Sequence, residues 1–574
     1  MKSFIYRLLT ILAALALSAC GGGGGGGGGG SPPSNVTVSG RITFDRVPFS
    51  ATTGNGLDYS QTVEAPARRV VVEALGTSGA VIATTATDDN GNYSLQVRSS
   101  TDVRIRAKVQ SVVSSTAAAP ASWNVSVRDN TNGSALYVLD GSLTSSGTSA
   151  QVRNLRAASG WGGTSYTSTR AAAPFAVLDT MYASVRFIVE QGAYTGAFPA
   201  LDVYWSTRNM SSTGDFVPAT GQIQATGYYV FQNGVGNGIY LLGDASLGAA
   251  SDTDEFDQHV LAHEFQHYVE DRLSRADSWG GDHSQSDRLD LRMAFSEGFA
   301  DAFSGMVLGD PVYRDSAGVW PSYDKILFDM ESNPTTDRGW FNEASVYSIA
   351  WDLFDMAADG VDTGSIGYAP MFDVFRNELR TGIPLGSIFA FAAALKQRPA
   401  VNDALVNAVV DREQIVAASI SPYADSETHD GGLPDVLPVY APNGPSVQVC
   451  GTTDAGTGDK LGNRRLLRFN MPATGPVHIQ VTAFDAASPP DPKIADPDLY
   501  IWKAGLFDYR ECAGPGSGAG CPAQNLEVYD NVAMPAGDYV LEVFEYSHVA
   551  PDPPAPAPPV VRRGRTCMLV TITG

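Results

Sequence analysis

The sequence predicts a multidomain protein in which a central α+β domain is flanked by an N-terminal and a C-terminal all-β domain. Its 574 residues exceed what one compact domain usually holds, which favours three or four domains. Apolar and polar side chains alternate over residues 103–109, as in a half-buried strand, whereas apolar residues recur at helical spacing over residues 175–189. Strand-like segments return beyond Pro442, so the pattern changes from strands to helices and back to strands.

The composition favours a folded protein that resides outside the cytoplasm. Charged residues make up only 17% of the chain, whereas Gly contributes 60 residues and Tyr 23. The 43% of hydrophobic residues can build cores, which excludes disorder over the whole chain. The net charge of −23 argues against a nucleic-acid partner, because phosphates require basic surfaces.

The N-terminus predicts a signal peptide and a lipid anchor. Lys2 and Arg7 form a basic segment before an apolar run at residues 8–17 that is too short to span a membrane as a mature helix. The segment Leu17-Ser18-Ala19-Cys20 follows and resembles the lipobox of bacterial lipoproteins. The resemblance implies removal of residues 1–19 and lipid on the Cys20 thiol, with an ordinary secretory signal as the alternative.

Ten consecutive glycines at residues 21–30 predict a flexible tether within residues 20–35. A tether of this kind lifts the folded part of the chain off a membrane surface. The expected location is therefore the bacterial cell envelope, with the protein held by its lipid and the outer membrane favoured.

Residues 36–155 are expected to form the N-terminal all-β domain. Within them, Asn90-Gly91 predicts a tight turn before a strand that includes Tyr93. The surrounding Thr-Asp and Gly-Asn-Tyr stretch resembles the carboxypeptidase regulatory-like β-sandwich over about residues 36–110, a domain that usually spaces or supports others. Residues 110–155 are rich in Ser, Thr and Ala, and their pattern assigns no element.

Residues 254–273 predict a helix that carries metal-binding chemistry. His263 and His267 are four residues apart, so both imidazoles project from one face of the helix, with Glu264 beside them. In the His-Glu-x-x-His motif the histidines bind zinc and the glutamate acts as a base. The alternative is that these histidines merely line a packed helix, although the chain has only seven His.

The next helical stretch, residues 291–308, supplies two carboxylates. Glu297 and Asp301 are one turn apart on an otherwise apolar helix, and two unpaired buried carboxylates are costly. A metal ion with its histidines would satisfy both. A solvated helix edge is the alternative, but Gly298 and Gly305 favour close packing against another helix.

Together these motifs resemble the gluzincin metallopeptidases, the thermolysin-like and fungalysin-like group, over about residues 237–308. The resemblance implies an α+β zincin-like catalytic domain within residues 156–440, flanked by all-β sandwiches. It implies that His263, His267 and Glu297 ligate zinc and that Asp301 orients a zinc histidine.

The reaction that this resemblance implies is the hydrolysis of peptide bonds in proteins or peptides outside the cytoplasm. A zinc-bound water would be activated by Glu264, which then returns the proton to the leaving amine. An endopeptidase is favoured, because the chain has no upstream Gly-x-Met-Glu-Asn segment typical of aminopeptidases.

Two departures from the gluzincin pattern concern the cleft. The 29 residues between His267 and Glu297 exceed the thermolysin spacing, so residues 272–290 are expected to form an inserted loop there. The downstream histidine that stabilises the oxyanion in thermolysin has no equivalent; Tyr347 is the candidate for that role and His429 a weaker one, although a core Tyr is the commoner interpretation. The strand at residues 238–243 is expected to be the edge strand that holds an extended peptide.

Residues 441–574 contain the four remaining cysteines, which predict two disulfides. Of the three possible pairings we favour Cys450–Cys567, joining the first and last strands, and Cys512–Cys521, closing a Gly-rich loop. A metal cluster is disfavoured because no Cys-x-x-Cys spacing occurs.

The same C-terminal region resembles the bacterial pre-peptidase C-terminal domain, a β-sandwich found on secreted peptidases. The resemblance rests on Asp498-Leu499-Tyr500 and Ala536-Gly537-Asp538-Tyr539. Asp496 and Asp498 are candidate Ca²⁺ ligands, although a structural turn is the commoner explanation for such a pair.

A second class of function fits the same domain order. The protein could be a surface adhesion or glycan-binding lipoprotein whose metal site is vestigial or structural. The intact Glu264 argues against that interpretation, because binding zinc does not require this glutamate.

Overall fold

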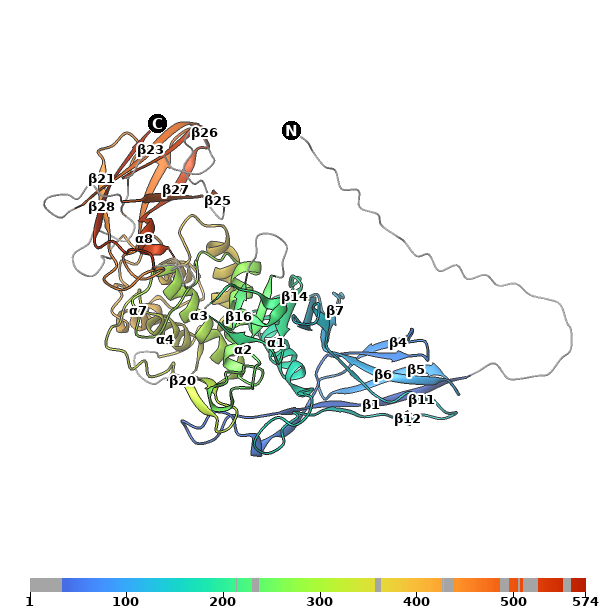
Figure 1. The fold of residues 1–574 in the computed structure, drawn as a ribbon. Helices are drawn as coiled ribbons and strands as arrows, with labels where there is room; N and C mark the ends of the chain where they lie inside the picture. Colours follow the sequence, from blue (N-terminus) through green and yellow to red (C-terminus); the bar gives the residue numbers. More distant parts are fainter. Residues whose placement is uncertain are drawn as a thin grey trace, which may run out of the picture.

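The computed structural model describes residues 34–574 except 213, 230–236, 357–362, 426, 428–437, 439, 486–494, 504–505, 509–524 and 551–558. Figure 1 shows strands coloured blue at one end of the molecule, helices in green and yellow in the middle, and strands in orange and red at the other end. The predicted order of β, α+β and β regions is therefore confirmed at the level of a multidomain chain.

The N-terminal β-sandwich consists of two five-stranded sheets. One contains β1 (Asn35–Arg46), β2 (Val63–Pro66), β5 (Asn92–Arg98), β12 (Gln151–Val152) and β13 (Leu155–Ala157). The other contains β3 (Val71–Leu75), β4 (Val81–Ala86), β6 (Asp102–Lys108), β10 (Val138–Asp140) and β11 (Thr144–Ser145). The alternation predicted for residues 103–109 is confirmed, because Val103, Ile105 and Ala107 of β6 are buried.

Residues 110–136 leave this sandwich and join a six-stranded central sheet. That sheet contains β7 (Gln110–Val113), β8 (Trp123–Asp129), β9 (Ala135–Leu136), β14 (Leu201–Trp205), β17 (Gly227–Tyr229) and β18 (Gly238–Leu241). The strand order is β17-β18-β14-β8-β7, with β9 paired to β8. The segment predicted as part of an N-terminal domain ending at residue 155 thus supplies strands to the central domain.

Helix α1 (Ala172–Glu190) packs against α2 and β8. Among the described residues it is the one helix long and apolar enough to cross a membrane, but 78% of that apolar stretch is buried inside the protein. Its apolar surface is therefore already covered by the central sheet and its neighbouring helices.

The helices α2 (Gln258–Leu273), α3 (Leu291–Leu308) and α4 (Glu343–Phe354) lie side by side in the central domain. Gly298 permits the approach of α4 to α3, since a Cβ there would clash with the carbonyl oxygen of Glu343. The central domain also contains three further helices, α5 (Tyr368–Val374), α6 (Ile388–Leu395) and α7 (Asp403–Arg412). It contains two two-stranded sheets as well, the hairpin of β19 (Val312–Ala317) and β20 (Tyr323–Asp329) and the short pair of β15 (Met210–Ser211) and β16 (Gln222–Gln224).

The C-terminal β-sandwich consists of two four-stranded sheets. One has the order β21 (Val447–Gly451), β28 (Thr566–Thr573), β23 (Gly475–Asp485) and β26 (Leu526–Met534). The other has the order β22 (Arg464–Met471), β27 (Gly537–Glu545), β24 (Pro497–Lys503) and β25 (Leu506–Asp508), and the short helix α8 (Tyr546–Val549) follows β27. Apolar side chains from both sheets, among them Val481, Leu541 and Val570, form the core between them.

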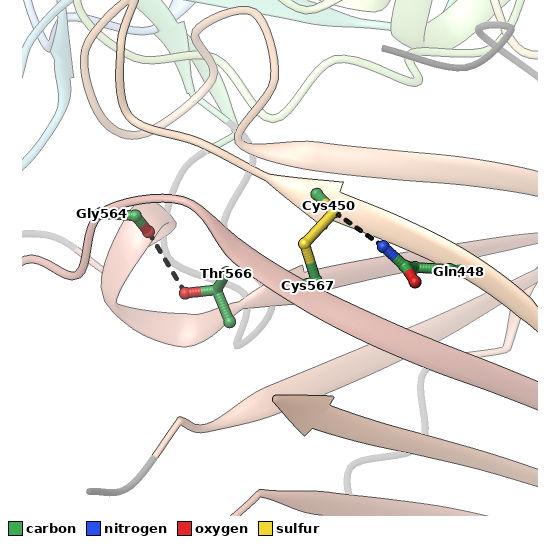
Figure 2. Close-up of a disulfide and its surroundings, with 5 residues drawn as sticks. All are labelled: Gln448, Cys450, Gly564, Thr566 and Cys567. Carbon is green, nitrogen blue, oxygen red and sulfur yellow. Dashed lines mark hydrogen bonds between the residues drawn. A yellow bond between two sulfur atoms is a disulfide. The ribbon is translucent and has the colours of Figure 1, made fainter. Parts of the chain in front are cut away.

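A disulfide links Cys450 on β21 to Cys567 on β28, as the favoured pairing predicted (Figure 2). The two cysteines are directly opposite each other in the antiparallel register, so the bond joins the first and last strands of the sandwich. Cys512 and Cys521 lie outside the described residues, as does Cys20. The pairing of Cys512 with Cys521 stays a prediction.

Candidate metal centre

Two neighbouring helices bring the predicted ligands together. Helix α2 presents His263, Glu264 and His267, and its opposite face is buried through residues such as Leu261, Phe265 and Val269. Helix α3 begins at the cap residue Asp290, whose side chain accepts a hydrogen bond from the backbone N–H of Arg292. It carries Glu297 and Asp301 on the face that packs against α2.

The donor atoms of His263, His267 and Glu297 lie within 4.8 Å of one another. The Nε2 atoms of the two histidines are 3.0 Å apart, and Glu297 Oε2 lies 3.3 Å from that of His263 and 3.1 Å from that of His267. Two imidazole nitrogens and one carboxylate oxygen are a donor set that proteins use to hold zinc with a fourth position left open.

The Nδ1 atom of each of the two ligand histidines, His263 and His267, also contacts a polar side chain. His263 Nδ1 donates to Asp301 Oδ1 at 2.8 Å, the contact predicted for Asp301. His267 Nδ1 lies 3.4 Å from Ser296 Oγ, which in turn donates to Glu270 Oε2 at 2.6 Å. These contacts orient both rings with Nε2 toward the centre of the site. The sequence analysis missed Ser296 and Glu270, although Glu270 stands one turn beyond His267 on the same helix.

The electrostatics of the site favour a bound cation. Burial alone would lower the pKa of His263, but hydrogen bonds to Asp301 and Glu297 outweigh it and raise that pKa to about 10. Burial alone would raise the pKa of Glu297, but the nearby His267 and His283 hold it well below its usual range. The carboxylates therefore stabilise positive charge at the point where the histidine nitrogens converge.

Glu264 lines the same cleft, and one of its carboxylate oxygens has no hydrogen-bond partner among the described residues. Its Oε2 is buried and forms no hydrogen bond with any described residue. Leaving a buried carboxylate oxygen unpaired is costly, so such an atom indicates an interaction with a molecule or ion outside the chain. The donor set and this oxygen together fit a zinc ion accompanied by a base.

The cleft has a volume of about 850 Å³. Residues 224–229 form one wall, and the other walls come from α2, α3 and the loop between them. Strand β17 lies at the edge of the central sheet as far as the structure describes it, whereas β18 lies inside the sheet. The edge strand predicted at residues 238–243 is thus an inner strand, and its antiparallel neighbour β17 borders the cleft instead.

Tyr347, the main candidate for stabilising the oxyanion, does not line the cleft. Tyr347 is 1% exposed and stacks on Phe328, so its ring belongs to the core, as the commoner interpretation held. His429 lies outside the described residues.

A histidine that the motifs did not single out lies at the cleft. His283 belongs to the loop of residues 274–290 between α2 and α3, here called the bridging loop. Its Nε2 lies 3.3 Å from Glu297 Oε2, and its Nδ1 lies 2.7 Å from Glu343 Oε2. Sequence reasoning predicted a loop at the cleft but could not predict which of its side chains faces the metal ligands.

A second group of acidic side chains lies at the start of α2. Carboxylate oxygens of Asp252, Asp254 and Asp315 lie within 4.8 Å of one another. One oxygen each of Asp252 and Asp315 is buried without a hydrogen-bond partner, and Lys325 pairs with both residues. The predicted calcium ligands Asp496 and Asp498 belong to no such convergent group within the described residues.

No known protein family and no curated protein matches the sequence. Three solved structures each align with 24% of this chain. They are the pre-peptidase C-terminal domain of collagenase from Bacillus anthracis (10% identity, 97% of that chain, TM-score 0.15), the surface-associated copper-binding protein CorA of Methylomicrobium album BG8 (11%, 96%, 0.16) and the periplasmic lysozyme inhibitor PliG of Aeromonas hydrophila (13%, 99%, 0.12). The low TM-scores and identities mean that these similarities assign neither a family nor a function.

Proposed function

We propose that the protein is a zinc-dependent metallopeptidase of the zincin type that hydrolyses peptide bonds outside the cytoplasm. The observation that supports this most strongly is the convergence of His263, His267 and Glu297 beside an unpaired, buried Glu264 oxygen. A zinc ion held by the three ligands would lower the pKa of a water molecule and polarise a carbonyl oxygen.

The side chains around the ligands have distinct roles in this proposal. Glu264 accepts a proton from the attacking water and delivers it to the departing amine nitrogen. Asp301 and the Ser296–Glu270 pair hold the two imidazoles in the ligating tautomer. These roles need no movement of either helix, because all the groups already line or border the cleft.

The proposed substrate is an extended stretch of protein or peptide. Strand β17 borders the cleft and is the outermost strand of the central sheet as far as the structure describes it, and an edge strand binds an extended peptide through main-chain hydrogen bonds. Recognition of main-chain groups suits cleavage within a chain, that is, endopeptidase activity.

The proposed setting is the bacterial cell envelope, with the chain anchored through lipid on Cys20. In this proposal the C-terminal β-sandwich is a pre-peptidase C-terminal domain, and Ca²⁺ occupies the group of Asp252, Asp254 and Asp315 rather than Asp496 and Asp498. The two orphan oxygens of that group are its support, because a divalent cation would satisfy both of them.

Glu264→Gln tests the assignment. The variant should retain one zinc per chain and lose casein hydrolysis by at least about 10³-fold, because Gln cannot accept the proton. Zinc is measured by mass spectrometry and hydrolysis with labelled casein, with and without chelator. Glu190→Gln on the exposed face of α1 is the matched control and should behave as wild type.

An active Glu264→Gln variant would contradict the proposed mechanism. A wild-type protein that binds zinc but cleaves no peptide would instead favour the adhesion or glycan-binding alternative with a structural metal site.

A further inference from the structure

The bridging loop is paired with the C-terminal β-sandwich through its backbone. The N–H of Asp290 donates to the carbonyl oxygen of Asp459 at 2.8 Å, and the N–H of Leu461 donates to that of Arg288 at 2.8 Å. Leu289 and Lys460 form an antiparallel bridge between these bonds. The end of the loop that leads into α3 is therefore an extension of the sandwich.

Lys460 fastens the middle of the loop. Its Nζ donates to the carbonyl oxygen of Asp282 at 2.6 Å and to Asp287 Oδ2 at 2.8 Å. Asp282 directly precedes His283, and the Lys460 side chain is only 12% exposed. The Lys460 ammonium group thus holds two points of the bridging loop, the backbone next to His283 and the carboxylate of Asp287.

The beginning of the loop packs against the same domain. The Trp279 ring lies 5.5 Å from that of Tyr500 and 5.7 Å from that of Trp502, measured between ring centroids. The guanidinium of Arg464 lies 5.3 Å from the Trp279 ring. Aromatic and cation–π contacts of this kind give the loop a defined place on the sandwich surface.

His283 is oriented and accessible in this arrangement. Nδ1 and Glu343 Oε2 share a hydrogen bond of 2.7 Å, which turns Nε2 toward the metal ligands. Nε2 lies near Glu297 but outside the three-donor group of His263, His267 and Glu297. The His283 side chain is 30% exposed and lines the cleft, so a substrate bound at the metal site would touch it.

We propose that His283 is a catalytic residue that hydrogen-bonds the substrate carbonyl oxygen, and that the C-terminal β-sandwich positions it through Lys460. This inference rests on the proposed peptidase function. Glu264 takes a proton from the water as the water oxygen bonds to the carbonyl carbon, and the C=O π electron pair moves onto the carbonyl oxygen, which accepts a hydrogen bond from His283 Nε2–H. The electron pair on that oxygen then restores the carbonyl, the C–N bond breaks with its electron pair leaving on nitrogen, and the amine nitrogen takes the proton held by Glu264.

One variant of the full chain, His283→Ala, distinguishes an oxyanion-stabilising role of His283 from a role as a metal ligand. His283→Ala should lower kcat by about 10²- to 10³-fold, as loss of an oxyanion donor does, with KM changed less than about 3-fold. The affinity for a phosphonate peptide analogue, measured by calorimetry on the zinc-loaded protein, should fall by a similar factor. Zinc retention against a competing chelator should stay within about 3-fold of wild type.

His478→Ala, whose side chain is exposed on β23 of the C-terminal sandwich, is the matched control. His283→Gln keeps a hydrogen-bond donor and should recover part of kcat. A loss of zinc affinity of about 10-fold or more in His283→Ala would make His283 a ligand and overturn the proposal. Unchanged kcat and phosphonate affinity would overturn it as well.

The positioning role of the sandwich is tested with Lys460→Met and Lys460→Arg. The Met variant should lose about 10-fold in kcat with KM and zinc content unchanged, and its amide hydrogens in residues 280–288 should exchange faster. The Arg variant should restore kcat, and Lys503→Met on the same sandwich, whose Nζ contacts Tyr539 OH, should match wild type. Faster exchange without a change in kcat would contradict positioning.

Failure of the proposed function has a different signature. If wild type hydrolyses no peptide, or if Glu264→Gln remains active, the peptidase assignment fails. If wild type hydrolyses casein while His283→Ala does so equally well, only the present inference fails.

Discussion

Asp301 is the residue on which the orientation of one metal ligand depends. It contacts His263 Nδ1 at 2.8 Å, and both side chains are buried. The carboxylate fixes the tautomer that leaves Nε2 free to bind a cation, and it increases the basicity of the ring. An amide in its place would keep the shape of the side chain but lose its charge.

Asp301→Asn should therefore weaken zinc binding by about 10- to 100-fold and lower casein hydrolysis in parallel at limiting zinc. Competition with a fluorescent chelator measures the affinity, and circular dichroism verifies the fold. Asp403→Asn, at the exposed start of α7, is the control. Wild-type zinc affinity in Asp301→Asn would show that the contact does not tune the ligand.

The residues that sequence could predict share one property. His263, Glu264 and His267 are fixed relative to one another by a single helix, and Glu297 and Asp301 by the next helix, so spacing alone determines their geometry. His283 and Glu343 meet only because the bridging loop folds back over α4, and no local pattern encodes that contact. Tyr347 was a candidate by position, but its ring packs on Phe328 in the core.

At the scale of elements, the start of α3 is joined to β27 by a buried charge network. Arg292 contacts Glu542 at 2.9 Å and Asp290 at 2.7 Å, while Arg464 contacts Glu542 at 2.8 Å. Burial alone would raise the pKa of Glu542, but the two guanidinium groups lower it from 4.5 to about 2. The helix that carries Glu297 is thus coupled to the C-terminal sandwich by charge.

Glu542→Gln should destabilise the protein by about 3 kcal/mol at neutral pH, because it removes the buried charge that two guanidinium groups share. The folded-state pKa is lowered, so this stabilisation is present above pH 4.5 and is lost as pH falls toward 2. The Tm difference between wild type and variant should shrink over that window in calorimetry. Asp530→Asn, on an exposed strand, should show no such convergence. A constant Tm difference from pH 7 to 2 would contradict the pKa assignment.

Elements with a strong local period were predictable, whereas their neighbours in space were not. The alternation in β6 and the helical spacing in α1 and α2 gave correct element types. The pairing of β8 with β14 and the inner position of β18 depend on contacts far apart in sequence, which periodicity does not report. The Ser- and Thr-rich composition of residues 110–136 concealed strands that are complete only within the central sheet.

At the scale of the whole molecule, the disulfide has a wide span. Cys450 and Cys567 are 117 residues apart, so the bond closes nearly the entire C-terminal sandwich into one loop. A crosslink across a long loop stabilises mainly by restricting the unfolded chain. Because the bridging loop is fastened to this sandwich, the stability of the sandwich also affects the position of the loop at the cleft.

The double variant Cys450→Ala/Cys567→Ala should lose about 5 kcal/mol of stability in the C-terminal sandwich, by the loop-entropy relation. Guanidinium unfolding followed by the fluorescence of Trp502 and its neighbours measures the loss. Any enzyme activity should also decline at a lower temperature than in wild type. A stability unchanged within about 0.5 kcal/mol would contradict the role assigned to this bond.

The domain order was predictable from composition and pattern, but the boundary between the first two domains was not. Strand β8 ends at Asp129, and its parallel neighbour β14 begins at Leu201. During synthesis the ribosome therefore adds about 70 more residues before β14 can pair with β8, whose partners until then are β7 and β9. An open strand edge can template pairing with another chain. The nascent protein thus passes through a stage in which the edge of β8 is exposed and a holding chaperone could cover it. This stage ends when β14 emerges from the ribosome.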